Sequence, residues 1–262
     1  MIDEKKGSTA RLAYVTACKY LTEAGFDDDA AHRNARDLLA YIRGMSGLNL
    51  LLHFDDQLST DEGSRYDEAI TRLADHEPIA YIIGSQEFAG FDIQLTPGVL
   101  IPRHDSLVLV NQALERLPKD KPARILELGC GSGAVILAVA SARPFVTGVA
   151  IDIDPLAIET SRLNFARYGV SDRIELIQVS WSDYSCESGS FDMVLSNPPY
   201  ISTEEMLDLD ASVKKEPHLA LWGGRDGLDC YRRILPLSRR VLRDGACCLV
   251  EIGWKQGQAV RD

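Results

Sequence analysis

The sequence has no long hydrophobic run, which bears on whether it enters a membrane. Its apolar stretches are shorter than the roughly 20 residues that a membrane-spanning helix requires, and no apolar signal core follows residues 1–6. We therefore expect a cytoplasmic protein with no membrane association. The six cysteines include no Cys-x-x-Cys pair, so the pattern indicates neither a zinc site nor a disulfide framework. The cysteines are expected to be reduced, and no metal is expected.

Positive charge is scarce. The chain has 28 Lys and Arg residues and 39 Asp and Glu residues, which gives a net charge of −11. This balance disfavours broad attraction to a phosphate backbone, and the chain has no basic, aromatic-rich segment typical of proteins that read nucleic acid. We therefore expect no direct reading of nucleic acid. The 262 residues, of which 45% are hydrophobic, suffice for one large domain or two.

The hydrophobic pattern divides the chain into three parts. Residues 1–80 show helical spacing without a strand pattern and predict a small helical bundle. The apolar runs at 78–84 and 87–95 predict a linker, residues 81–106, with strands that form a short hairpin. In residues 107–262 short apolar strands alternate with helices, which predicts an α/β fold with a mostly parallel, twisted sheet covered by helices on both faces.

The strands and helices expected in this third part have the following bounds. The strands are residues 124–128, 146–151, 174–179, 191–196 and 246–252, and the helices are residues 107–117, 134–142, 155–168 and 230–242.

A proline pair follows the expected strand 191–196, in the sequence Asn197-Pro198-Pro199-Tyr200. Two prolines supply no N–H to a sheet and fix their own φ, so the backbone leaves the strand in a rigid, extended turn. The turn presents polar groups and a ring at the carboxyl end of a strand, where open α/β sheets bind ligands. Because Asn and Pro are common turn residues, the motif alone is also compatible with a plain loop.

A glycine-rich turn follows the expected strand 124–128. It consists of Gly129, Cys130, Gly131, Ser132 and Gly133. Glycines let the backbone turn tightly and approach a ligand at a helix N-terminus. The nicotinamide dinucleotide fingerprint has its third glycine three residues after the second, whereas the spacing here is Gly-x-Gly-x-Gly.

Two carboxylates and a tryptophan flank this turn in the expected sheet. Glu127 can face the ammonium group of a methionine moiety, and Asp152, at the end of the second strand, can accept both hydroxyls of a ribose. Asp152 could instead cap the next helix, but Asp154 before Pro155 fits that role better. Trp181 could flank a purine or simply pack.

These motifs together resemble a known enzyme class. The order and spacing of the Glu127 to Gly133 run, Asp152 and the Asn-Pro-Pro-Tyr motif are similar to those of class I S-adenosylmethionine-dependent methyltransferases that act on a planar NH₂ group. Adenine methyltransferases share the motif with the HemK/PrmC family, which methylates the glutamine of the Gly-Gly-Gln loop in peptide-chain release factors. The segments similar to the HemK/PrmC family are residues 77–84, 87–88, 97–103, 216–221 and 224–228, and the likeness continues to 251–253.

The resemblance implies a Rossmann-like fold, the cofactor S-adenosyl-L-methionine, the product S-adenosyl-L-homocysteine, and a release factor as the protein substrate. The cofactor contacts that it implies are Glu127, Gly129, Cys130, Gly131, Ser132, Gly133, Asp152, Ile153, Trp181 and Asn197. The substrate contacts that it implies are Asn197, Pro198, Pro199, Tyr200 and Arg103, of which Asn197, Pro198 and Tyr200 are the expected catalytic residues. Arg103 could instead be a surface charge. The helical bundle would hold the partner, and the enzyme is expected to be a monomer.

The sequence departs from the family pattern in three places. Where the family has Ile-Pro-Arg-Pro-Glu-Thr-Glu, residues 101–107 read Ile-Pro-Arg-His-Asp-Ser-Leu, so the last carboxylate is absent. Ser180 stands in place of an aspartate, so the adenine amino group would bond Asp183 or the backbone. Only residues 254–262 follow the fifth strand, where the family continues with a helix and an antiparallel strand pair. Either the sequence is cut short, or the fifth strand is left as an edge that could pair with another chain.

Three other functions remain open at this point. They are methylation of a glutamine on a ribosomal protein, N6-methylation of adenine in nucleic acid, and a non-catalytic binding module that uses the helical bundle as a docking surface.

Overall fold

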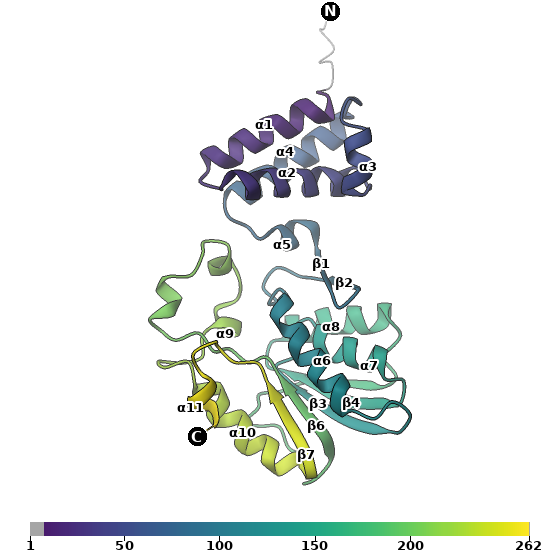
Figure 1. The fold of residues 1–262 in the computed structure, drawn as a ribbon, viewed down its shortest axis with the longest axis vertical. Helices are drawn as coiled ribbons and strands as arrows, with labels where there is room; N and C mark the ends of the chain where they lie inside the picture. Colours follow the sequence, from purple (N-terminus) through teal and green to yellow (C-terminus); the bar gives the residue numbers. More distant parts are fainter. Residues whose placement is uncertain (1–7, 262) are drawn as a thin grey trace, which may run out of the picture. The chain divides into compact units, whose positions relative to one another are not determined.

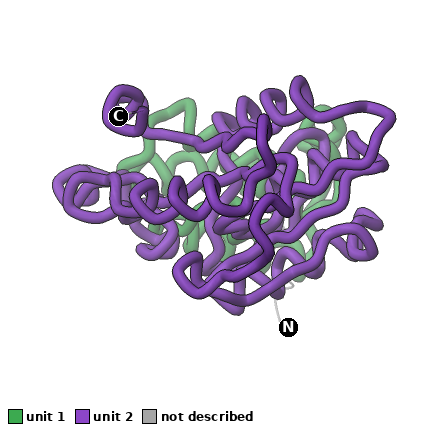
Figure 2. Tube along the Cα trace, turned by 90° about the horizontal axis from the view of Figure 1, so that it is seen from below, with its two compact units in different colours: residues 1–83 green, residues 84–262 purple. Residues whose placement is uncertain are grey.

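The computed structural model describes residues 8–261 (Figure 1). The chain divides into two compact units, one ending at Ile83 and the other beginning at Gly84 (Figure 2). Among the described residues, no helix is long and apolar enough to cross a membrane.

The first unit is a set of short helices. They are α1 (Ala10–Glu23), α2 (Asp28–Ile42), α3 (Gly47–Leu52), α4 (Thr60–Ala74) and α5 (Ile79–Ile83). The first four begin after a Thr, Asp or Ser residue whose side chain accepts a backbone N–H of the first turn. Leu21, Leu38, Leu39, Leu50 and Tyr66 are fully buried between these helices. The local sequence thus starts each helix, and one apolar core holds them together.

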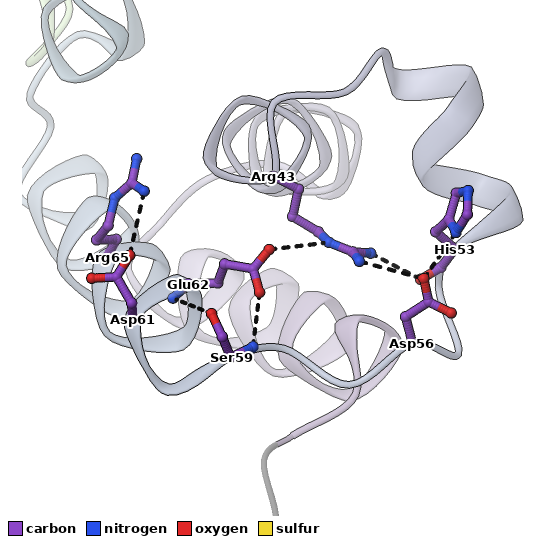
Figure 3. A network of polar contacts seen from close by, with 7 residues as sticks. All are labelled: Arg43, His53, Asp56, Ser59, Asp61, Glu62 and Arg65. Atoms are coloured by element: carbon purple, nitrogen blue, oxygen red, sulfur yellow. Dashed lines mark hydrogen bonds and ion pairs between the residues drawn. The ribbon is translucent and has the colours of Figure 1, made fainter.

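A polar network centred on Arg43 joins the end of α2 to the start of α4 (Figure 3). The Arg43 side chain is only 9% exposed. Its guanidinium donates to the His53 carbonyl at 3.0 Å and to Asp56 Oδ2 at 3.4 Å, and it pairs with Glu62 Oε1 at 3.6 Å. Glu62 also closes a capping box with Ser59 at the start of α4. Arg43 therefore connects the end of α2 to the segment after α3 and to the first turn of α4.

The interpretation of residues 78–84 as a strand is wrong, because Ile79–Ile83 is the helix α5. A short apolar run does not distinguish a buried strand from a helix, and Pro78 directly before the run suits the start of a helix. The hairpin is confined to β1 (Ser85–Phe88) and β2 (Phe91–Gln94). Ala89 and Gly90 both have positive φ in its two-residue turn.

The core of the second unit is a five-stranded parallel sheet. Its strands are β3 (Ala123–Leu128), β4 (Val146–Asp152), β5 (Ile174–Gln178), β6 (Phe191–Ser196) and β7 (Leu242–Val250), in the spatial order β5-β4-β3-β6-β7. The predicted parallel sheet is therefore confirmed. The chain proceeds from β3 to β5 on one side and then crosses to β6 and β7 on the other. The carboxyl ends of β3 and β6 thus form the topological switch point, where such sheets bind ligands.

Helices cover both faces of this sheet, as the alternating pattern predicted (Figure 1). On one face lie α6 (Leu107–Arg116), α7 (Ala134–Ala142) and α8 (Pro155–Arg167), which contact one another in sequence order. On the other lies α10 (Asp229–Val241). Because side chains alternate across a strand, Leu126 and Leu128 face α10, where they share a core with Ile234 and Leu237.

The remaining elements are short. They are the 3₁₀ helices η1 (His104–Ser106), η2 (Glu205–Leu207) and η3 (Val213–Lys215), and the helices α9 (His218–Leu221) and α11 (Gly257–Arg261). Strand β7 begins at Leu242, four residues before the predicted start, and a register irregularity near Phe191 accompanies this beginning. Within residues 8–261, β7 pairs only with β6, so it forms one edge of the sheet, and no antiparallel strand pair follows it.

Candidate active site

A cavity of about 260 Å³ lies at the carboxyl ends of β3, β4 and β6. Seven of the predicted site residues line it: Gly129, Gly131, Asp152, Ile153, Trp181, Asn197 and Pro199. The structure therefore brings the glycine turn, the acid after the second strand and the Asn-Pro-Pro motif to one cavity. Further lining residues come from the segments 98–100, 217–224 and 229–233. Residues 98–100 and most of 217–224 lie in segments that resembled the HemK/PrmC family, although none of these lining residues was given a role.

The three glycines of the turn serve different purposes. All three have positive φ, at +74° for Gly129, +56° for Gly131 and +76° for Gly133. A Cβ on Gly133 would lie 2.5 Å from Phe165, so this glycine permits close packing of α7 on α8. A Cβ on Gly129 would lie 3.2 Å from the Trp181 ring. No protein atom lies within 4 Å of a Cβ placed on Gly131, so this glycine leaves open space where it lines the cavity.

Asp152 links the second strand to the glycine turn. Its Oδ2 accepts the Gly131 N–H at 2.9 Å, and its Oδ1 accepts the Asp154 N–H at 3.0 Å. Burial raises the pKa of the Asp152 carboxyl, and the backbone donors oppose that rise. Each carboxylate oxygen has a second lone pair, so both can still accept a ribose hydroxyl. Asp154 caps α8, as the sequence indicated, because its Oδ1 accepts the Leu156 N–H at 2.8 Å.

Glu127 lies behind the turn and is not among the residues that line the cavity. It is 2% exposed, and its Oε2 accepts the Ile136 N–H at 3.3 Å. Burial raises the pKa of the Glu127 carboxyl well above its usual value, and the charge of Asp152 adds to the rise. The predicted contact of Glu127 with an ammonium group remains a prediction.

Three other residues of the turn also face the protein interior. Cys130 Sγ lies 3.6 Å from Ser161 Oγ, and the Ser132 carbonyl accepts the Asn164 side-chain amide at 3.0 Å. Together with Gly133, they are not cavity-lining residues. In this structure they support the turn, and their predicted contact with a cofactor is untested.

The Asn-Pro-Pro-Tyr motif leaves β6 in an extended path. The Asn197 amide donates from Nδ2 to Ser106 Oγ at 3.0 Å. Pro198 is buried, whereas Pro199 lines the cavity. A Cβ on Gly223 would lie 2.7 Å from the Pro199 carbonyl oxygen, so the loop after α9 packs directly on the motif backbone. Ser106 therefore holds the side chain of Asn197, and the loop after α9 packs on the backbone at Pro199.

A carboxylate lies near each of Tyr200 and Arg103. Burial raises the pKa of Tyr200, and the charge of Glu251 adds to the rise. Arg103 forms an ion pair with Glu216, whose side chain is 1% exposed and also accepts the Ile101 N–H at 3.1 Å. Arg103 is thus anchored in the loop before α6, and its contact with a substrate remains a prediction.

The loop after β5 contributes Ser180 and Trp181 to the cavity. Ser180 Oγ lies 2.9 Å from Ser182 Oγ, and Asp183 accepts the Ser182 hydroxyl at 3.3 Å. Asp183 is therefore engaged within the loop and is not a lining residue. Ser180 therefore lines the cavity at the position where the family pattern has an aspartate.

Two residues near the motif had no role in the sequence interpretation. Ser106 and Glu251 lie 91 and 54 positions from Asn197, on either side of it in the chain. Ser106 Oγ accepts from Asn197 Nδ2, and Glu251 accepts the Ser106 hydroxyl. Both belong to segments that the family pattern covers, namely the stretch after Arg103 and the end of the fifth strand. The likeness to the family pattern marks these two segments, but it does not show which side chains contact one another.

The residues present fit S-adenosyl-L-methionine. The Asp152 carboxylate suits a ribose diol, the open backbone at Gly131 leaves room for the methionine portion, and Trp181 offers an aromatic face for a purine. Among residues 8–261, no group of three His, Cys, Asp or Glu side chains is arranged to hold a metal ion.

Comparison with known proteins agrees with this site. A family model of the PrmC N-terminal domain matches residues 13–84, and a model of the methyltransferase small domain matches residues 108–213. The release factor glutamine methyltransferase of Moorella thermoacetica is 37% identical over 256 residues, which cover 97% of this chain and 89% of that protein. This chain belongs to the release factor glutamine methyltransferase family.

Another member of the release factor glutamine methyltransferase family, that of Escherichia coli, is 37% identical over 234 residues, which cover 89% of this chain and 83% of that protein. A solved structure of a SAM-dependent methyltransferase from Geobacter sulfurreducens, in complex with S-adenosyl-L-homocysteine, is 23% identical with a TM-score of 0.38 and covers 56% of this chain and 47% of that chain. In this family the cofactor is S-adenosyl-L-methionine, which the cavity fits.

Proposed function

We propose that this chain transfers a methyl group from S-adenosyl-L-methionine to the side-chain amide nitrogen of the glutamine in the Gly-Gly-Gln motif of a peptide-chain release factor. One observation carries the proposal. Asn197 and Pro199 line the same cavity as Gly131 and Asp152, so the groups suited to an amide and the groups suited to the cofactor share one space. The names of the family members supply the class of protein substrate.

The chemistry requires a well-held amide. An amide nitrogen is a poor nucleophile because its lone pair is delocalised into the carbonyl group, so the enzyme must align that lone pair with the methyl group. In our proposal the Asn197 side-chain oxygen and the Pro198 carbonyl accept the two amide N–H bonds and hold the nitrogen about 3 to 3.5 Å from the methyl carbon. The bound cofactor supplies a methyl group on a cationic sulfonium.

The same two oxygens would then stabilise the positive charge that develops on the nitrogen. When bound, the cofactor would supply the methyl group as its S–C bond breaks, and the amide nitrogen would become positive as the N–C bond forms and would then release a proton to water. Oxygen acceptors placed in advance would stabilise this charge without a general base. In our proposal Tyr200 walls the site by packing on the planar amide.

Methyl transfer with tritiated cofactor tests the proposal directly. Purified release factor, ribosomal protein and DNA are offered in parallel, with a release factor in which the Gly-Gly-Gln glutamine is replaced by alanine as the control. We expect incorporation into the intact release factor alone. Label in ribosomal protein or DNA instead would support the rival substrates, and no label in any of them would support a non-catalytic binding module.

Replacement of Asn197 tests the acceptor role. The variant Asn197→Ala should reduce methylation of the release factor by at least about 100-fold, because one of the two aligning acceptors is lost. Its affinity for the cofactor should change little, because Gly131 and Asp152 remain. Equilibrium dialysis with labelled cofactor measures this affinity. Unchanged methylation by the variant would refute the proposed mechanism.

The other parts of the chain have proposed roles of their own. The bundle of residues 1–80 binds the release factor, residues 81–106 link it to the catalytic part, and residues 107–262 carry the chemistry. Hydrogen exchange of the full chain with and without release factor tests this division, since α1 to α4 should gain protection. Unchanged exchange in these helices would contradict the role of the bundle.

We further propose that the protein acts in the cytoplasm as a monomer. Light scattering at increasing concentration measures the mass, and cell fractionation measures the location. A dimeric mass at low micromolar concentration would contradict the monomer.

A further inference from the structure

Ser106 joins two segments that meet at the end of the sheet. It is the last residue of η1, and its side chain is buried. The Ser106 hydroxyl donates to Glu251 Oε2 at 2.6 Å and accepts from Asn197 Nδ2 at 3.0 Å. Glu251 directly follows β7 and Asn197 directly follows β6, which are neighbouring parallel strands. The strand order therefore brings both side chains to one hydroxyl.

Glu251 is tied to its surroundings through both its side chain and its backbone. Its carboxylate accepts the Ser106 hydroxyl at 2.6 Å, and the neighbouring Tyr200 and Asn197 side chains lower its pKa. Its own N–H donates to the Ser196 carbonyl at 2.9 Å, so the backbone of Glu251 is tied to β6. Burial raises the pKa of the Glu251 carboxyl, the charge of Asp105 raises it further, and the neighbouring hydroxyl and amide groups oppose the rise. In its ionised form Glu251 only accepts hydrogen bonds.

This chain of bonds has one consistent direction. Because the Ser106 hydrogen points to Glu251, Ser106 presents only lone pairs to Asn197. The group of Asn197 on this side must therefore be the NH₂, because a flipped amide would place its oxygen against the lone pairs of Ser106. The Asn197 oxygen, Oδ1, consequently lies on the other edge of the amide group, away from Ser106 Oγ, and Asn197 lines the cavity.

We propose that Ser106 and Glu251 are positioning residues that fix the rotation of the Asn197 amide, so that its oxygen is presented to the substrate amide. The inference rests on the proposed function, because it assigns the orientation of the acceptor in that reaction. Neither Ser106 nor Glu251 lines the cavity. Both act through Asn197, so their loss lowers turnover and leaves the binding of the cofactor and of the release factor intact.

The experiment compares two replacements of Ser106. Ser106→Ala removes the hydroxyl, and Ser106→Thr keeps it and introduces the residue that the family pattern has at this position. We expect kcat for methylation of the release factor to fall by about 100-fold in Ser106→Ala, with KM and the Kd for the cofactor within about twofold of the wild type, and to recover in Ser106→Thr. Ser190→Ala, in the turn before β6, is the control for loss of a serine hydroxyl and should match the wild type.

A second variant tests the carboxylate and guards against misfolding of the first. Glu251→Gln keeps the size of the side chain but replaces one acceptor oxygen by an NH₂ group, so the Ser106 hydroxyl can meet a donor in place of the oxygen that orients it. We expect kcat to fall at least tenfold at unchanged cofactor Kd. In the double variant Ser106→Ala with Glu251→Gln, kcat should fall no further than in the more affected single variant, because the two residues act as a unit.

The outcomes separate the two proposals. If the wild type does not methylate release factor, the proposed function itself is wrong. If the wild type is active and Asn197→Ala is not, but Ser106→Ala and Glu251→Gln retain the wild-type kcat, the positioning role alone is wrong. Equal losses in Ser106→Ala and Ser106→Thr would also overturn it, because the hydroxyl would then not matter.

Discussion

Gly133 is a position where both the backbone conformation and the packing require a glycine, and Gly133→Ala tests that requirement. With φ at +76°, a residue with a Cβ pays about 1–2 kcal/mol for the left-handed backbone. The new Cβ would also lie 2.5 Å from Phe165 and 2.8 Å from Ser161, both of which are buried. Relief of such overpacking costs about 1–3 kcal/mol. The free energy of unfolding should therefore fall by about 2–5 kcal/mol.

Gly169→Ala is the matched control. Gly169 has a φ of +67°, but no atom lies within 4 Å of a Cβ placed there. The control thus shares the backbone cost and the change in chain entropy of the unfolded state, and only the packing cost differs. We expect Gly133→Ala to be less stable than Gly169→Ala by about 1–3 kcal/mol.

Urea unfolding followed by tryptophan fluorescence is the suitable assay. All three tryptophans, Trp181, Trp222 and Trp254, lie in the second unit, so the signal reports on the unit that contains both glycines. If Gly133→Ala and Gly169→Ala unfold with the same free energy, the packing of α7 against α8 does not require a glycine and the reasoning fails.

Two further predictions concern buried charge. Below a pH of about 4.5, Glu127 is protonated in both the folded and the unfolded protein. Because its pKa is raised in the folded protein, the unfolded chain ionises first as the pH rises, and the free energy of unfolding falls until the pH passes the folded-state pKa. Glu127→Gln should therefore be more stable than the wild type at pH 8 in urea unfolding of the cofactor-free protein and equal to it at pH 4, whereas a constant difference would refute the assignment. In the first unit, Arg43→Met should lower stability by about 2 kcal/mol, because charged hydrogen bonds of a buried guanidinium are lost. The control Arg65→Met removes only the exposed pair with Asp61 (Figure 3) and should change stability by less than about 0.5 kcal/mol. Hydrogen exchange in α2 and α4 measures both, and equal effects would contradict a special role of Arg43.

The sequence by itself determined the local features of the site. Apolar runs alternating with helical spacing predicted the five parallel strands, and residues 129–133 predicted the turn at the amino end of α7. Asp154 before Pro155 predicted the start of α8. These features follow from short-range rules, because strand period, capping and glycine geometry depend on a few neighbouring residues. The same rules failed at Ile79–Ile83, where a five-residue apolar run fits a helix and a strand equally well.

Only the tertiary structure decided which side chains meet. The contact of Asn197 with Ser106 spans 91 positions and that of Ser106 with Glu251 spans 145, and no local pattern encodes either. The order β3-β6-β7 places the ends of β6 and β7 side by side, and the loop before α6 then passes over both. The Asn-Pro-Pro-Tyr motif thus predicted the acceptor from sequence, but the direction in which the Asn197 side chain points depends on long-range packing of the sheet.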